Sequence, residues 1–185
     1  VTSEMFDGKK GIKVIPCYYK KDYPEWSDRG DGPGAPVAVH LPNSPVIATG
    51  KRDGSKIRLP NGNYLEETAS YYVMIETKGG GYTPALITMK STQLNVSKKW
   101  NSMMKTIQIP DGKGGFAIPP MHGVVYNLAS TLQKNDKGSW YGWVVTQDRI
   151  LGQADKALYL SAKDFSGNVS KGTVQTKADV EEKVS

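Results

Sequence analysis

The sequence predicts a mainly β fold with two short helices, on three observations. Twenty glycines and eleven prolines among 185 residues are typical of a chain with many turns. Short segments alternate apolar and polar side chains, which is the period of a strand that buries one face. Only two segments, within 89–107 and 154–172, space their apolar residues along one face of a helix. We therefore expect a single domain over residues 1–172, followed by a polar C-terminal tail over 173–185.

The first half of the chain is expected to form strands joined by loops. Residues 11–26 begin with a strand pattern, and 37–40 and 45–49 are two further short strand candidates. Residues 50–63 are expected to form a loop, which holds four basic side chains. The clearest hairpin covers residues 69–89, because alternating segments flank three consecutive glycines.

The second half is expected to contain both helices and another hairpin. The first helix has one apolar face, formed by Val96, Trp100, Met103, Met104 and Ile107. Trp100 is therefore expected in the core, with the lysines of this helix outside. Residues 123–147 are expected to form a hairpin around 135–138. The second helix also has one apolar face, formed by Leu158, Ala162, Phe165 and Val169.

Charge is distributed unevenly along the chain. Residues 89–105, MKSTQLNVSKKWNSMMK, contain four lysines and no acid. A solvated helix usually alternates its charges, since opposite charges three or four residues apart support each other. The net charge is +6, and residues 150–185 hold five basic and five acidic residues, so the whole excess lies in 1–149. This pattern suits a polyanionic partner.

Cofactor and catalytic motifs are absent from the sequence. Cys17 is the single cysteine, so neither an internal disulfide nor a multi-cysteine metal site is expected. His40 and His122 are isolated, which argues against a zinc site, and phosphate-binding and dinucleotide-binding fingerprints are missing. No apolar stretch approaches the ~20 residues needed to span a bilayer. We therefore predict no cofactor, no catalytic residue and no membrane segment.

One enzymatic alternative remains open. Glu76 and Lys78 have the E-x-K spacing of metal-dependent nucleases, and Glu66 and Glu67 lie upstream as candidate metal ligands. Such a site would bind Mg²⁺ through carboxylate oxygens and activate water. The simpler interpretation, which we adopt, is that Glu76 and Lys78 face solvent before the glycine turn.

Aromatic and basic residues are interleaved in two segments. Tyr18, Tyr19, Tyr23 and Trp26 surround Lys20 and Lys21, and Trp140, Tyr141 and Trp143 follow Lys134 and Lys137. Neighbours on a strand point to opposite faces, so one ring of Tyr18/Tyr19 and one of Trp140/Tyr141 is expected outside the core. An aromatic beside lysines can stack a single-stranded base, at ~1–3 kcal/mol for each contact, while the lysines bind phosphates.

Four segments in this order resemble a family of tailed-phage proteins associated with replication and single-stranded DNA binding. They are GIKVIPCYYKKDYPEW, RLPNGNYLEETASYY, ALITMKSTQLNVSKKWNSMM and NDKGSWYGWVV, and the likeness covers about residues 7–175. The resemblance implies an OB-like β-barrel that coats single-stranded DNA in the cytoplasm of the infected bacterial host. Members are expected to begin upstream of Val1, so this chain is expected to be a fragment. Phage replication proteins and further copies of the chain are the other partners that this interpretation allows.

We therefore predict a non-enzymatic single-stranded DNA-binding protein that acts in replication or recombination. The residues expected to bind phosphates are Lys20, Lys21, Arg52, Lys56, Arg58, Lys98, Lys99 and Lys105. The residues expected to stack bases are Tyr19, Trp26, Tyr72 and Trp140. A shift of one residue in strand register would exchange Tyr19 for Tyr18 and Trp140 for Tyr141. A structural or regulatory phage protein that binds another protein is the alternative, and its affinity would depend little on salt.

Overall fold

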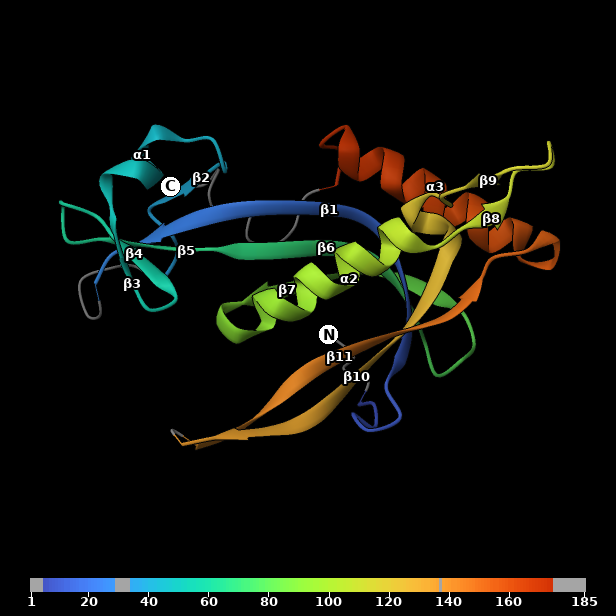
Figure 1. Ribbon diagram of the computed structural model, residues 1–185, viewed down its shortest axis with the longest axis horizontal. Helices are drawn as coiled ribbons and strands as arrows, with labels where there is room; N and C mark the ends of the chain where they lie inside the picture. Colours follow the sequence, from blue (N-terminus) through green and yellow to red (C-terminus); the bar gives the residue numbers. More distant parts are fainter. Residues whose placement is uncertain (1–4, 29–33, 137, 175–185) are drawn as a thin grey trace. The chain divides into compact units, whose positions relative to one another are not determined.

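The computed structural model describes residues 5–28, 34–136 and 138–174 (Figure 1). The predicted tail beyond residue 174 lies outside this part of the chain. The fold is mainly β, as predicted, and the described residues contain three α-helices rather than two. The contacts divide the chain into two compact units. Unit 1 comprises residues 1–18, 72–86 and 107–185, and unit 2 comprises residues 19–71 and 87–106.

The strands account for most of the regular structure. They are β1 (Ile12–Trp26), β2 (Ala38–His40), β3 (Lys51–Asp53), β4 (Lys56–Arg58), β5 (Tyr64–Glu66), β6 (Thr68–Glu76), β7 (Tyr82–Lys90), β8 (Ile109–Pro110), β9 (Phe116–Ala117), β10 (Val124–Asn135) and β11 (Gly138–Ile150). The α-helices are α1 (Pro45–Thr49), α2 (Leu94–Thr106) and α3 (Lys156–Ser170). Short 3₁₀ turns cover Ser91–Gln93, Met121–Gly123 and Gln153–Asp155. Strands β1, β6 and β7 each have residues in both units.

Nine of the described strands are hydrogen-bonded into one sheet. Its main path runs β11-β10-β1-β5-β4-β3, while β2 and β6 also pair with β1, and β7 pairs with β6. The β6–β7 and β10–β11 hairpins confirm the two hairpins predicted from alternation and turn residues. The remaining strands, β8 and β9, form a small separate ladder.

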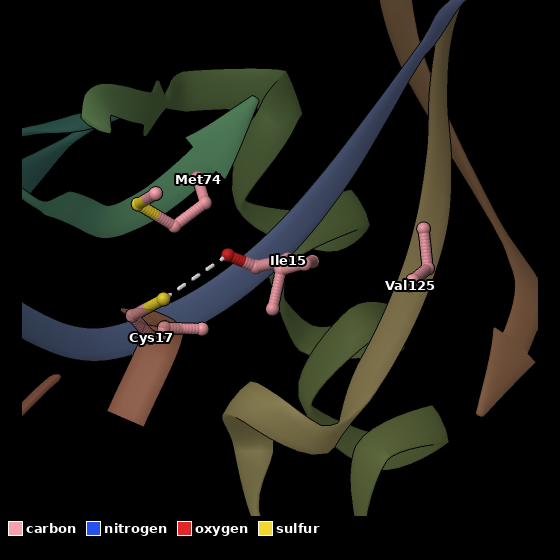
Figure 2. Close-up of a cluster of buried hydrophobic side chains, with 5 residues drawn as sticks. Ile15, Cys17, Met74 and Val125 are labelled. Carbon is pink, nitrogen blue, oxygen red and sulfur yellow. Dashed lines mark hydrogen bonds between the residues drawn. The ribbon is translucent and has the colours of Figure 1, made fainter. Parts of the chain in front are cut away.

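The core of unit 1 lies between its strands and α3. Ile15, Cys17, Met74 and Val125 are buried together, and Ala162 brings α3 against them (Figure 2). The Cys17 Sγ–H donates to the Ile15 carbonyl oxygen at 3.4 Å (Figure 2). Burial raises the pKa of the Cys17 thiol to about 12. Cys17 is therefore a small apolar core residue, as its sequence context predicts.

The core of unit 2 contains two parts. Tyr23, Ile57, Leu59 and Leu65 form one cluster, against which Val46 and Ile47 of α1 pack. In the other part, the Trp100 side chain of α2 is fully buried and stacks on the Tyr71 ring, with centroids 4.4 Å apart. The Tyr71 hydroxyl donates to the Ser97 carbonyl oxygen at 3.1 Å, which fixes α2 on β6. The prediction that Trp100 belongs to the core is confirmed.

One buried carboxylate organises the loops of unit 2. Glu25 is 7% exposed and accepts hydrogen bonds from the side chains of Asn63 (2.6 Å), His40 (2.7 Å) and Asn61 (3.2 Å). The Asn63 amide, followed by His40 and Asn61, holds the pKa of Glu25 below its usual value despite burial. The network ties β2 and the β4–β5 connection to the end of β1.

Two of the expected elements were wrong. Residues 45–49 form α1 instead of a strand: Pro45 occupies the first turn, where its fixed φ fits and its missing N–H costs nothing. Packing of Val46 and Ile47 on the core outweighs the strand preference of these β-branched residues. Residues 50–63 were expected to be a loop, but they contain β3 and β4. These two strands pair antiparallel, with Lys51 opposite Arg58 and Asp53 opposite Lys56.

Candidate nucleic-acid interface

The outer side of the β3-β4-β5-β1 ladder in unit 2 brings aromatic and basic side chains together. Lys51 lies opposite Arg58, Arg58 opposite Tyr64, and Tyr64 opposite Trp26. Directly opposite residues of antiparallel strands share a face, with Cβ atoms about 4.5–5.5 Å apart. We call the surface formed by Trp26, Lys51, Lys56, Arg58, Tyr64 and Lys90 the Trp26–Tyr64 face.

Alternation along the same strands explains why this side carries no core residues. Ile57 and Leu65 are buried and point to the opposite side, into the cluster with Tyr23. Arg58, which follows Ile57 on β4, and Tyr64, which precedes Leu65 on β5, are only partly buried. A period of two therefore separates the core side of these short strands from the Trp26–Tyr64 face.

Cations lie against both aromatic rings of this face. The Lys56 amine is 3.6 Å from the centroid of the Tyr64 ring, and the Arg58 guanidinium is 5.4 Å from it. The Lys90 amine is 5.4 Å from the centroid of the Trp26 ring. Such cation–π contacts are worth about 0.5–1 kcal/mol at exposed sites, so they are weak enough for a ligand to replace.

Acidic residues compensate part of the positive charge of the face. Arg58 forms ion pairs with Asp28 at 3.2 Å and with Asp53 at 3.5 Å, which raise the pKa of its guanidinium, and Lys90 pairs with Glu66 at 2.8 Å. Within the described residues, Lys51 and Lys56 form no ion pair. Two cations of the face are thus not neutralised by an acid among the described residues.

Helix α2 carries a second set of basic residues in unit 2. Lys98, Lys99 and Lys105 are exposed, while Trp100 and Ser97 on the opposite side of the helix are buried. None of these three lysines has an ion-pair partner in the part of the chain that the structure describes. Their charge therefore faces outward, as the acid-free segment predicts. Arg52 of β3 is exposed as well.

The predicted residues of β1 are more strongly engaged within the protein. The Tyr19 ring is half-buried, with its centroid 5.0 Å from that of Tyr71. Lys20 pairs with Asp22 at 3.3 Å, and Lys21 pairs with Glu67 at 2.5 Å, a contact that raises the pKa of the Lys21 amine. These two lysines are less suited to bind phosphates than those of α2.

Two predicted stacking residues, Tyr72 and Trp140, belong to unit 1, and the prediction for Tyr72 needs correction. Tyr72 is 6% exposed and packs edge-on against Tyr18, with centroids 6.0 Å apart, so its ring has no open side for a base. Trp140 is half-buried, while its neighbour Tyr141 is 69% exposed. On β11, Tyr141 is thus the more exposed ring of the two alternatives that the sequence left open.

Sequence reasoning missed Tyr64, Lys51 and Lys90. Each is close in sequence to residues that were selected. Residues 50–63, directly before Tyr64, were expected to be a loop, and no strand was assigned to Tyr64 itself, so the sequence did not indicate which way its side chain points. The alternation of Tyr64, buried Leu65 and Glu66 is the signal that points the tyrosine outward. Three residues are too few for this pattern to be decisive without the pairing partner.

A comparison with models of protein families assigns this chain to a family. The model of a family described as Pam3 phage gp34-like protein matches residues 1–175. The chain belongs to this family. No curated protein and no solved structure matches it.

Membership in the Pam3 phage gp34-like family confirms the phage part of the resemblance, over nearly the extent expected. The family's description states no activity. Within the described residues, no three His, Cys, Asp or Glu side chains form a group that could hold a metal ion. Glu66, a candidate nuclease ligand, pairs with Lys90 in unit 2, while Glu76 and Lys78 belong to unit 1. No described helix is long and apolar enough to cross a membrane.

Proposed function

We propose that this phage protein binds single-stranded DNA through the Trp26–Tyr64 face and the lysines of α2, without catalysing a reaction. The observation that carries the proposal is the cross-strand pair of Tyr64 and Trp26, with basic side chains lying against both rings. Base–aromatic stacking tolerates any sequence, since every base has a π face, and cations bind the backbone between stacked bases.

The contact between Lys56 and Tyr64 suggests how binding proceeds. The Lys56 amine covers the Tyr64 ring in the free protein, at 3.6 Å from its centroid. When a base stacks on this ring, the flexible lysine side chain swings aside, and its amine then binds the phosphate beside that base. Tyr64 thereby exchanges a weak cation–π contact for a stacking contact, and Lys56 gains a phosphate.

The basic residues supply the electrostatic part of the affinity. Lys51, Lys56, Lys98, Lys99 and Lys105 lack an internal acidic partner among the described residues, so a phosphate does not have to compete with a carboxylate for them. Each phosphate neutralised on a single strand releases counterions and contributes a slope of about −0.7 to log K against log salt. An OB-like barrel that presents a sheet face to the strand, acting in replication or recombination in the host cytoplasm, fits this mode of binding.

The proposal is tested by fluorescence anisotropy of a labelled oligo-dT, with EDTA present, over a series of salt concentrations. We expect binding whose log K falls linearly with log salt. Absence of binding at the lowest salt, or an affinity that does not depend on salt, would overturn the proposal. Degradation of the oligonucleotide on adding Mg²⁺ would instead favour the nuclease alternative.

The role of the face is tested by Tyr64→Leu, with Phe116→Leu of β9, an aromatic residue of unit 1 that is 70% exposed, as a matched control. Loss of one stacked base costs ~1–3 kcal/mol, which is about 5- to 150-fold in Kd. We expect this loss for Tyr64→Leu with an unchanged salt slope, because no charge is removed, and an unchanged Kd for Phe116→Leu. Equal affinities of the Tyr64 variant and the parent chain would exclude Tyr64 from the site.

A further inference from the structure

Strand β2 of unit 2 carries a row of exposed aliphatic side chains. Val39 lies in the middle of β2 and is 44% exposed. Val37 and Leu41, which directly precede and follow the strand, are 50% and 65% exposed. The residues between them, Ala38 and His40, are less exposed. This alternation places Val37, Val39 and Leu41 on one side of β2, and we call them the β2 row.

The β2 row lies on the same side of the sheet as the Trp26–Tyr64 face. Strand β2 pairs antiparallel with the C-terminal end of β1, where Val39 lies opposite Pro24 (Figure 1). Pro24 and Trp26 are two residues apart on β1, so they share a side, about 7 Å apart along the strand. Tyr23 and Glu25, which alternate with them, are buried on the other side. The β2 row and the Trp26–Tyr64 face therefore form one continuous surface of unit 2.

The order of the strands decides what reaches the β2 row. Glu25 pairs with Ala38 of β2 and with Leu65 of β5, so β2 and β5 flank this end of β1 on opposite edges. The Val37 N–H donates to the Glu25 carbonyl oxygen at 2.8 Å, so Val37 also lies against the end of β1. A strand of nucleic acid that crosses the Trp26–Tyr64 face from β5 to β1 therefore reaches the β2 row next.

The chemistry of the surface changes along this path. The Trp26–Tyr64 face offers two rings with lysines lying against them. The side chains of Pro24 and of the β2 row are hydrocarbons, which carry no charge and no hydrogen-bonding group. Cations that attract phosphates are thus followed, on the same side of the sheet, by a region suited only to apolar groups. This continuity favours a nucleotide of the bound strand as the occupant of the row.

We propose that Pro24 and the β2 row form an apolar subsite for the nucleotide next to the one that stacks on Trp26, and that this subsite selects DNA over RNA. The proposal rests on the proposed function of the Trp26–Tyr64 face. The 2′-hydroxyl is the group by which a protein distinguishes RNA from DNA at a given site. A deoxyribose has only C–H groups at C2′ and packs on aliphatic side chains. A 2′-hydroxyl at the same place loses water without gaining a hydrogen-bond partner.

The first measurement compares labelled oligo-dU and oligo-rU in the anisotropy assay at low salt. The two oligonucleotides differ only in the 2′-hydroxyl, so their bases and charges are matched. A hydroxyl buried without a partner weakens binding by about 5- to 150-fold, and we expect the Kd of oligo-rU to exceed that of oligo-dU by a ratio in this range. Equal Kd values would overturn the inference and leave the proposed function intact, whereas failure of both oligonucleotides to bind would overturn both.

The β2 row itself is tested by Val37→Thr with Val39→Thr. Threonine keeps the shape and the strand preference of valine and adds a hydroxyl that can bond the 2′-hydroxyl. The ratio of the two Kd values should therefore fall towards one, mainly through tighter binding of oligo-rU. The matched control is Ile118→Thr with Val144→Thr, at positions of unit 1 that are 59% and 38% exposed, and its ratio should equal that of the parent chain. A ratio that is unchanged in the β2 variant, or that falls equally in the control, would show that the β2 row does not select DNA.

Discussion

The salt dependence of DNA binding measures directly whether α2 contacts the phosphates. Lys98 and Lys99 are exposed, carry no ion pair within the described part of the chain, and lie beside the buried Trp100 that fixes the helix. Replacing both with glutamine removes two positive charges and leaves the packing of Trp100 intact. If each amine neutralises one phosphate, the slope of log K against log salt becomes less negative by about 1.4, at about 0.7 per phosphate.

The assay is the anisotropy titration of oligo-dT at several salt concentrations, performed with Lys98→Gln/Lys99→Gln and with a matched helix control. Lys156→Gln/Lys163→Gln removes the same charge from exposed positions of α3 in unit 1 and should leave the slope unchanged. The affinity loss of the α2 variant should be largest at low salt. A slope equal to that of the parent chain would refute the placement of α2 at the site. Equal changes in both variants would show that the lysines of α2 act only through the net charge of the protein.

Three further predictions concern the cores that position these surfaces. Glu25→Gln should lower the free energy of unfolding at neutral pH by about 1–3 kcal/mol, because its three hydrogen bonds lose their charge. Because the pKa of Glu25 is lowered in the native protein, its charge contributes fully to the free energy of unfolding above the ordinary pKa of a glutamate. This contribution disappears as pH falls through the native pKa, so urea unfolding should show the free energies of unfolding of the two proteins converging in acid. Cys17, with its pKa raised to about 12, should not react with Ellman's reagent near pH 8 until urea unfolds the chain, and rapid reaction of the native protein would contradict its burial. Trp100→Ala should cost about 3–5 kcal/mol in the same urea assay, since its side chain is fully buried, and a loss below about 1 kcal/mol would show that α2 is not anchored by this ring.

How far the sequence predicted the fold depended on the length of each element. Strands β10 and β11 and helices α2 and α3 have 12 to 15 residues, long enough for their periods to be recognised without a partner. Strands β3, β4 and β5 have three residues each, and α1 has five, so the conformational preferences of their own residues were not enough to predict their secondary structure. Their structure depends on the core cluster that Ile57 and Leu65 form with Tyr23, a contact between distant parts of the sequence.

The same limit explains the outcome for the candidate site. Most basic residues of the site could be selected from composition, because an excess of charge is visible without a fold, although Lys51 and Lys90 were missed. Of the two aromatic residues, Trp26 was selected but Tyr64 was not, since the two meet only through the pairing of β1 with β5, across 38 positions of sequence. Tyr72 shows the converse: its strand pattern was correct, but both faces of β6 are buried here, so alternation did not imply exposure.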